Sequence, residues 1–247
     1  MIAYVSIAAF HVRQLLRIPF FVQTALLTPV TFLLMRALGA LNSGAIVPGL
    51  AWFDASAAGM WATTTTAVGL IGFQRFQGTL ELQVFSVRQP SVVFGPLTSA
   101  AALIGLIGIP VAVLLQLLLT RNVHLSLSVL LGLFTATVAC VASAAVLSAV
   151  FVVSVSARAF EPLILTPVWM LVGIVAPFTA LPSWLLPFAL AHPLTSAVLV
   201  SRQPDFIPAL GWAGVSVAVS ALYLIVAGFG LRVAIKRARV DGTLAMS

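Results

Sequence analysis

The chain has very little charge. Only 7% of its 247 residues are Asp, Glu, Lys or Arg, whereas 62% are hydrophobic and the mean hydropathy is +1.19. A soluble domain with so apolar a surface would aggregate, and long runs with few charges are typical of transmembrane helices. At about 20 residues per span, the chain has room for about six spans and short loops, and none for a sizeable soluble domain.

Acidic residues and lysine are also scarce. Five Asp and Glu stand against twelve Lys and Arg, and Lys236 is the one lysine. On a soluble protein the net charge of +7 would suggest nucleic acid as a partner. In a membrane protein, however, basic residues flank the spans and gather at the cytoplasmic face. We therefore expect membrane lipid, and no nucleic acid, around this chain.

Several motifs that carry chemistry are missing. The single cysteine, Cys140, lies in an apolar stretch and allows no internal disulfide. No Gly-x-x-x-x-Gly-Lys-[Ser/Thr] phosphate loop is present, so we do not expect this chain to hydrolyse ATP itself. There is no Ser-His-acid grouping, no pair of acids in one span and no metal-ligand spacing. We therefore expect no catalytic residue, no metal site and no cofactor in this chain.

The apolar runs predict an all-α integral membrane protein, with one transmembrane domain over residues 1–247 and six transmembrane helices. Two prolines in the third run favour a kink or a tilt there. The six predicted spans are 20–41, 54–73, 92–119, 125–155, 163–180 and 207–231.

Residues 1–18 differ from a span. Their apolar residues recur at helical spacing on one side, and Arg13 and Arg17 lie away from that side. This pattern is typical of an amphipathic interfacial helix that lies along the membrane surface. A signal peptide is the alternative, but the charged part is long and the apolar part is nearly of span length.

Prolines divide the apolar stretch 181–206, which precedes the last span. Pro182, Pro187 and Pro193 each remove a backbone donor and disrupt the preceding turn. Unpaired backbone groups facing lipid are very costly, so a broken re-entrant pair of half-helices shielded by protein fits better than a span. An ordinary proline-kinked span is the alternative.

The basic residues predict the orientation. With six spans and the N-terminus inside, nine Lys and Arg lie on the cytoplasmic side and three on the outer side. The positive-inside rule then places both termini, segment 74–91 and the basic tail 232–247 in the cytoplasm, and the half-helices outside. The three outer basic residues are Arg36, Arg121 and Arg202.

Segment 74–91 is longer and more polar than a link between two antiparallel spans needs to be. Thr79 is positioned to cap a short helix. That helix would show Leu80, Val84 and Phe85 on one side, ready for a groove in a partner protein. A solvated loop with interfacial arginines is an equally good interpretation.

The order of these segments resembles that of the permease subunit of type-2 ABC transporters. An amphipathic helix and two spans precede "QRFQGTLELQVFSVRQP", and two further spans precede "EPLILTPVWMLVGIVAPFTALPSWLLPFALAHPLTSAVLVSRQ" and the last span. The residues that match the family's motifs are Gly78, Thr79, Leu80 and Glu81, then Gly173, Pro177, Leu181-Pro182-Ser183-Trp184-Leu185, His192-Pro193-Leu194-Thr195 and Arg202.

The chain also departs from the family. Gln74 and Gln77 stand where the family has acidic residues before its Gly-Thr pair. The family's lysine near the start of the third span is replaced around Gly95-Pro96.

The resemblance implies a mechanism. Two permeases, identical or similar, would pair in the bacterial cytoplasmic membrane, and each would dock on a separate ATP-binding subunit that holds ATP and Mg²⁺. The second and fifth spans would lie at the dimer interface and open or squeeze a path for a lipophilic drug, antibiotic or lipid-linked molecule, capped by the outer half-helices. The coupling residues implied are Gln74, Arg75, Gln77, Gly78, Thr79, Leu80, Glu81 and Arg88.

Some polar residues are candidates for the substrate path, namely Thr63, Thr66, Gly173 and Pro177. Hydroxyls within a span more often bond back to carbonyls of the preceding turn, and we favour that interpretation for the run "TTTT".

Three other polar residues lie near predicted span ends. Arg36 either snorkels to lipid headgroups or contacts substrate, with Asp54 as a conceivable ion partner. His192 fits a helix end better than a metal site.

Two other classes of protein are alternatives. An ion-coupled secondary transporter usually buries acidic residues near mid-membrane, whereas every Asp and Glu here falls at or near the end of a predicted span. A non-transporting membrane scaffold is the second alternative, and stimulation of an ATPase by the reconstituted chain would distinguish it from a transporter.

Overall fold

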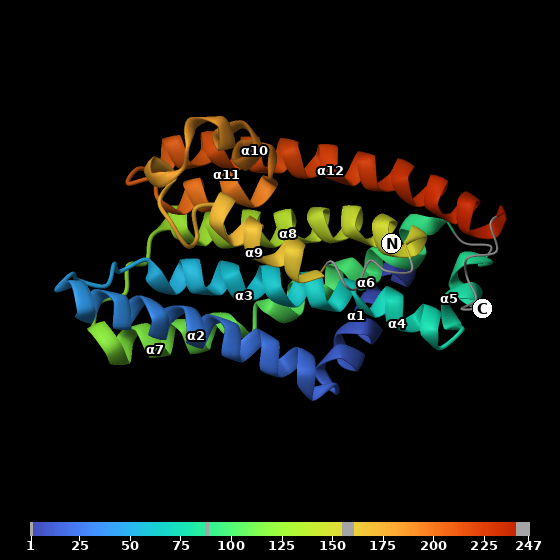
Figure 1. Ribbon diagram of the computed structural model, residues 1–247, viewed down its shortest axis with the longest axis horizontal. Coiled ribbons are helices and arrows are strands. Elements are labelled where there is room, and N and C mark those ends of the chain that lie inside the picture. The colour runs from blue at the N-terminus through green and yellow to red at the C-terminus, as the bar shows by residue number, and fades with distance from the viewer. Residues whose placement is uncertain (1, 87–88, 155–160, 241–247) are drawn as a thin grey trace.

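The fold is a bundle of helices that run side by side along one long axis (Figure 1). It is known from a computed structural model that describes residues 2–86, 89–154 and 161–240, with no strand in these ranges. The all-α class is thus confirmed. The elements are α1 (Ile2–Leu16), α2 (Pro19–Ser43), α3 (Ala51–Val68), α4 (Leu70–Phe76), α5 (Thr79–Val84), α6 (Pro90–Gly105), α7 (Gly108–Thr120), α8 (Leu127–Val153), α9 (Glu161–Leu171), η2 (Phe178–Ala180), η3 (Ser183–Leu185), α10 (Leu186–Ala191), α11 (Pro193–Ser201) and α12 (Phe206–Val240).

Four helical segments in the described part of the chain are long and apolar enough to cross a membrane. They are α2, α6 together with α7, α8, and α12, and a bent pair formed by η3–α10 and α11 raises the number to five. The transmembrane character expected from composition is therefore confirmed. The count of six stays a prediction, because α3 is not among these helices and α9 has only 11 residues.

α3 is the central helix of the bundle. Seventeen of its 18 residues are buried, and it packs against α2, α6, α7, α8 and α9. Polar residues are costly in lipid, and neighbouring helices shield those of α3 from it. The second predicted span is therefore enclosed by its own chain, although we expected it at a dimer interface.

Glycines allow α3 to approach its neighbours closely. A Cβ atom on Gly105 would lie 2.6 Å from the Cα of Met60 and 2.7 Å from Oγ1 of Thr63, and one on Gly59 would lie 2.9 Å from Cδ of Pro29. Small residues at such crossings bring helix backbones together, which is the main way helices gain packing energy in a membrane.

The stretch 181–206 breaks where the sequence predicts. η3–α10 and α11 are bent by 97° relative to each other, and Pro193 is the first residue of α11. Eight of the nine residues of α11 are buried, and the helix packs against α8 and α12. A re-entrant path through the membrane stays a prediction.

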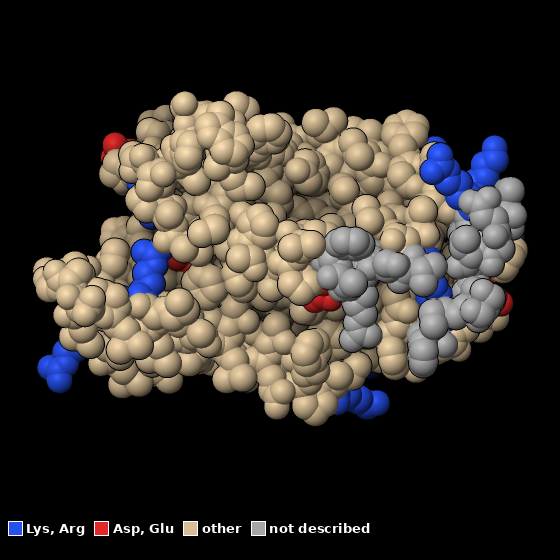
Figure 2. Space-filling model, viewed as in Figure 1, with Lys and Arg blue, Asp and Glu red and all other residues tan. Residues whose placement is uncertain are grey.

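The two ends of the bundle differ in what they carry. α4, α5 and the last turns of α12 lie at one end in Figure 1, and the α2–α3 connection, α10 and α11 lie at the other. Figure 2 shows Lys and Arg toward both ends of this face, with mostly uncharged residues and one acidic patch between them. α1 packs against α6, where Tyr4 Oη and Ser99 Oγ are 2.8 Å apart. Its expected place in the membrane interface stays a prediction.

We predict that Gly105→Ala destabilises the protein. The added methyl group would overlap the backbone of Met60, and overpacking of this kind costs about 1–3 kcal/mol. The midpoint of thermal unfolding in detergent should fall. Gly214→Ala on α12 is the control, because a Cβ there meets nothing within 4 Å. Equal midpoints for the two variants would show that α3 and α6 are not in close contact.

Candidate coupling element and outer charge cluster

The segment after the second predicted span forms a helical elbow, which we define as α4, Gly78 and α5. Gly78 has φ = 71°, in the left-handed region that favours glycine, and it reverses the chain between the two helices. The short helix expected here is confirmed. Its cap was predicted wrongly, because Gly78 is the cap and Thr79 is the first residue of α5, with its hydroxyl donating to the Gln74 carbonyl at 3.2 Å.

The apolar face of α5 was predicted to face a partner protein, and two of its residues do not. Leu80 and Val84 are fully buried against a core formed by α4, α6, α8 and α12, so they do not face a partner. They lie four residues apart on one face, and the nearest apolar surface is that of their own bundle. Phe85, the third residue of the predicted face, is exposed as expected, at 60%, and Leu82 is exposed at 76%.

Arg75 fastens the elbow to α8. Its side chain is buried, and its guanidinium donates to the carbonyls of Phe151 and Val152 in the last turn of that helix. A cation here also complements the negative end of the α8 dipole. Burial lowers the pKa of the Arg75 guanidinium, but an arginine stays charged in proteins.

The remaining predicted coupling residues differ in exposure. Gln77 and Gly78 are exposed, Gln74 and Glu81 are half-buried, and Arg88 lies outside the described residues. Arg75 is among the coupling residues implied by the resemblance, and its guanidinium faces the interior of the bundle.

A charge cluster lies at the opposite end of α3, and we define it as Arg36, Asp54 and Arg202. Asp54 is in the first turn of α3, and its Oδ2 is 3.1 Å from an Nη of Arg36 on α2. Its Oδ1 is 2.9 Å from an Nη of Arg202, which follows α11. The ion pair between Arg36 and Asp54 was suggested by the sequence and is confirmed.

Both arginines also bind the backbone that follows α9. Arg202 donates to the Gly173 carbonyl at 2.9 Å, and Arg36 donates to the Ile174 carbonyl. The charge cluster thus connects α2, α3, α11 and the break after α9. Nothing local in the sequence predicts the second pair, because Arg202 is 148 residues from Asp54.

Gly173 allows the backbone after α9 to pass close to the ring of Phe178. Its φ is 80°, and a Cβ atom there would lie 2.5 Å from the ring of Phe178. The sequence placed Gly173 on the substrate path, but it is buried and its carbonyl accepts a bond from Arg202. Pro177 is exposed just before η2.

Three of the four threonines of α3, namely Thr63, Thr65 and Thr66, bond back to their own helix, as predicted, whereas Thr64 does not. Thr63 donates to the Gly59 carbonyl at 2.8 Å and Thr66 to the Ala62 carbonyl at 2.8 Å. Thr63 is buried against α6 and lines none of the cavities described here. Thr66 lines a cavity of about 230 Å³ near the C-terminal end of α3, next to Glu161.

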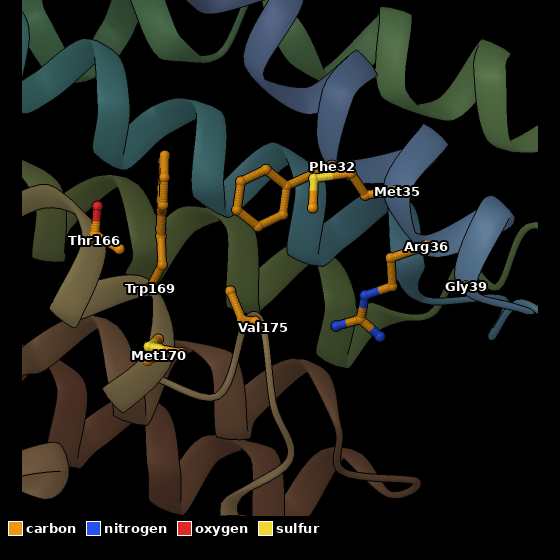
Figure 3. Close-up of a pocket in the computed structure, with 8 residues that line it drawn as sticks. All are labelled: Phe32, Met35, Arg36, Gly39, Thr166, Trp169, Met170 and Val175. Atoms are coloured by element: carbon orange, nitrogen blue, oxygen red, sulfur yellow. The ribbon is translucent and has the colours of Figure 1, made fainter.

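An apolar groove that sequence analysis missed lies between α2 and α9. Figure 3 shows its walls, which enclose about 510 Å³. The rings of Phe32 and Trp169 meet edge to face at 4.9 Å, and the Trp169 indole donates to the Ala58 carbonyl of α3 at 3.3 Å. The lining residues are Phe32, Met35, Arg36, Gly39, Thr166, Trp169, Met170 and Val175.

His192 is at a helix end, as predicted. It is the N-cap of α11, and its Nδ1 accepts a hydrogen bond from the Leu194 N–H at 3.3 Å.

No protein-family model, curated protein or solved structure matches this chain. The fold and the charged ends define a helical protein of transmembrane character, and the family resemblance stays a prediction from the sequence motifs.

We predict an order of stability among variants of the charge cluster. Asp54→Asn leaves two arginines without their carboxylate, whereas Arg36→Gln leaves one ion pair intact. Breaking a buried pair costs about 3–5 kcal/mol. Because solvent reaches about a third of each guanidinium, we expect roughly 2 kcal/mol for Asp54→Asn and less for Arg36→Gln. Thermal unfolding measures both, with Arg121→Gln as the control. A larger loss for Arg36→Gln would contradict this order.

Proposed function

We propose that the chain is the permease subunit of an ATP-driven exporter of the type-2 ABC class, in a bacterial cytoplasmic membrane. It would act with a separate ATP-binding subunit and a second permease, and move a lipophilic drug, antibiotic or lipid-linked molecule outward. The observation that carries the proposal is the helical elbow. It is a short helical element after the second predicted span, it bears the Gly-Thr-Leu-Glu motif, and it packs onto the bundle through Leu80, Val84 and Arg75.

The elbow has a direct connection to the rest of the bundle. Only Gly69 separates α4 from α3, and its backbone is itself helical. A push on α5 would therefore pass through α4 into α3, whose other end carries Asp54. In this mechanism, motion driven by ATP at the elbow shifts α3 and changes the contacts of the charge cluster with the break after α9.

The second permease would meet α9 and α2. α9 has no buried residue, whereas α3 has almost no surface left for a partner. This refines the expectation from the resemblance, which placed the second and fifth spans at the dimer interface. Packing of two copies through α9 would enclose the apolar groove.

The contacts of Asp54 disfavour an ion-coupled secondary transporter. Such a protein needs an acidic group that can exchange a proton or a metal cation. Asp54 is the buried acid among the described residues, and two arginines occupy both of its oxygens.

We predict that the elbow is cytoplasmic and that the α2–α3 connection is external. Single cysteines at Gln77 and Ser43, both exposed sites, would be treated with an impermeant thiol reagent in intact cells. The native Cys140 is buried and should stay unlabelled. Ser43→Cys should react and Gln77→Cys should react only after lysis. The reverse result would overturn the topology.

We predict that Glu81→Lys uncouples the permease from its ATPase. Glu81 lies on α5 beside the exposed Leu82, and reversing a charge in a close interface pair costs about 2–5 kcal/mol. The variant should insert normally, lose co-purification with the ATP-binding subunit and lose substrate-stimulated ATP hydrolysis.

Arg121→Glu, after α7 at the opposite end of the bundle, is the control and should keep both properties. Normal assembly and normal stimulated hydrolysis with Glu81→Lys would show that Glu81 is merely a solvated residue.

A further inference from the structure

Two adjoining cavities share one arginine. Arg36 lines the apolar groove between α2 and α9, and it also lines a second cavity of about 460 Å³ whose wall includes Asp54 and Arg202. Figure 3 shows Arg36 extending from α2 toward the stretch that carries Val175. One end of a molecule bound in the groove would therefore lie next to the charge cluster.

The charge cluster has a net positive charge. Two guanidiniums share one carboxylate, so its three side chains carry a net charge of +1. In their described contacts, each arginine uses one terminal nitrogen, which binds both Asp54 and a carbonyl after α9. A guanidinium has five N–H donors, so donors remain on both for an anion. Arginine pairs of this kind bind carboxylate or phosphate oxygens with charge-assisted hydrogen bonds.

The groove suits an apolar chain of limited size. Its walls are Phe32, Trp169 and two methionines, Met35 and Met170, and thioether side chains adapt to varied apolar shapes. Its volume of about 510 Å³ is within the range of sites for drug-sized ligands. A two-chain phospholipid is too large for the groove to enclose.

We propose that this site binds a single-chain or drug-sized amphiphile with one acidic group. The acidic head is held by Arg36 and Arg202, and the apolar part lies between α2 and α9. This deepens the proposed function, because it takes the acidic amphiphile as the transported substrate. Binding itself requires neither ATP nor the partner subunit, so it can be tested separately from transport.

The test uses the full chain in phosphatidylcholine nanodiscs, with dodecanoate brominated at its end as the probe. Bromine in the groove quenches the fluorescence of Trp169. Because the chain has four other tryptophans, the groove signal is the part of the quenching that is lost in Trp169→Phe. Dodecanol brominated at the same carbon is the neutral control. Because charge-assisted hydrogen bonds form only with the acid, we expect it to bind about tenfold more tightly than the alcohol. Arg36→Gln should remove this preference, so that the acid and the alcohol bind with similar affinity.

A glycine of the groove provides a blocking variant. Gly39 lines the groove and a Cβ there meets nothing within 4 Å, so Gly39→Leu should fill the space without disturbing the fold. It should weaken the binding of both probes at least tenfold, by an order-of-magnitude estimate for loss of the apolar contact. Gly211→Leu, at an equally open position on α12, is the control and should bind both probes normally.

Several results would overturn the proposal. One is that the acid and the alcohol bind with equal affinity, and another is that Gly39→Leu binds both probes as the wild type does. A third is that phosphatidylglycerol displaces the acid, which would identify the groove as a site for a resident lipid. If the acid binds as expected but ATP and the partner ATPase drive no transport of any substrate, the proposed function fails and the site stands. If ATP drives export of another substrate and the acid does not bind, the site fails and the proposed function stands.

Discussion

The polar side chains of α3 must be kept away from lipid, and this requirement organises the bundle. Asp54 and the four threonines belong to a helix that five others enclose. The threonine hydroxyls are satisfied largely within the helix itself, so they place few demands on its neighbours. Asp54 has no such local partner. Its two arginines come from α2 and from the end of α11, and this places both elements around the N-terminal end of α3.

The features that the sequence predicted correctly are those that depend on local composition. Apolar runs give the long helices, and Pro193 gives the break before α11. The incorrect predictions concern tertiary packing. A helix as short as α5 has an apolar face, but only the surrounding helices decide whether Leu80 and Val84 face the bundle or a partner.

The charge cluster could be predicted only in part. Arg36 and Asp54 lie at the neighbouring ends of two consecutive helices, and a short connection between helices brings such ends together. Arg202 reaches the same carboxylate from the far end of the chain, and the groove between α2 and α9 depends on where α9 lies against the bundle. Neither position follows from helical periodicity. In the proposed mechanism, these unpredicted features are the ones that would meet the substrate, while the predicted elbow would meet the ATPase.

The modest apolarity of α3 also bears on how the protein reaches its membrane. A segment with an aspartate, a serine and four threonines in 18 residues gains little by entering lipid alone during synthesis. α2, by contrast, is apolar enough to insert by itself, and only seven residues separate it from α3. If α3 crosses the membrane as the sequence predicts, it would enter the bilayer as the second arm of a helical hairpin with α2. The ion pair between Arg36 and Asp54 would then join the two helices before the later ones enclose α3. In that case biogenesis would depend on an early contact between Arg36 on α2 and Asp54 in the first turn of α3.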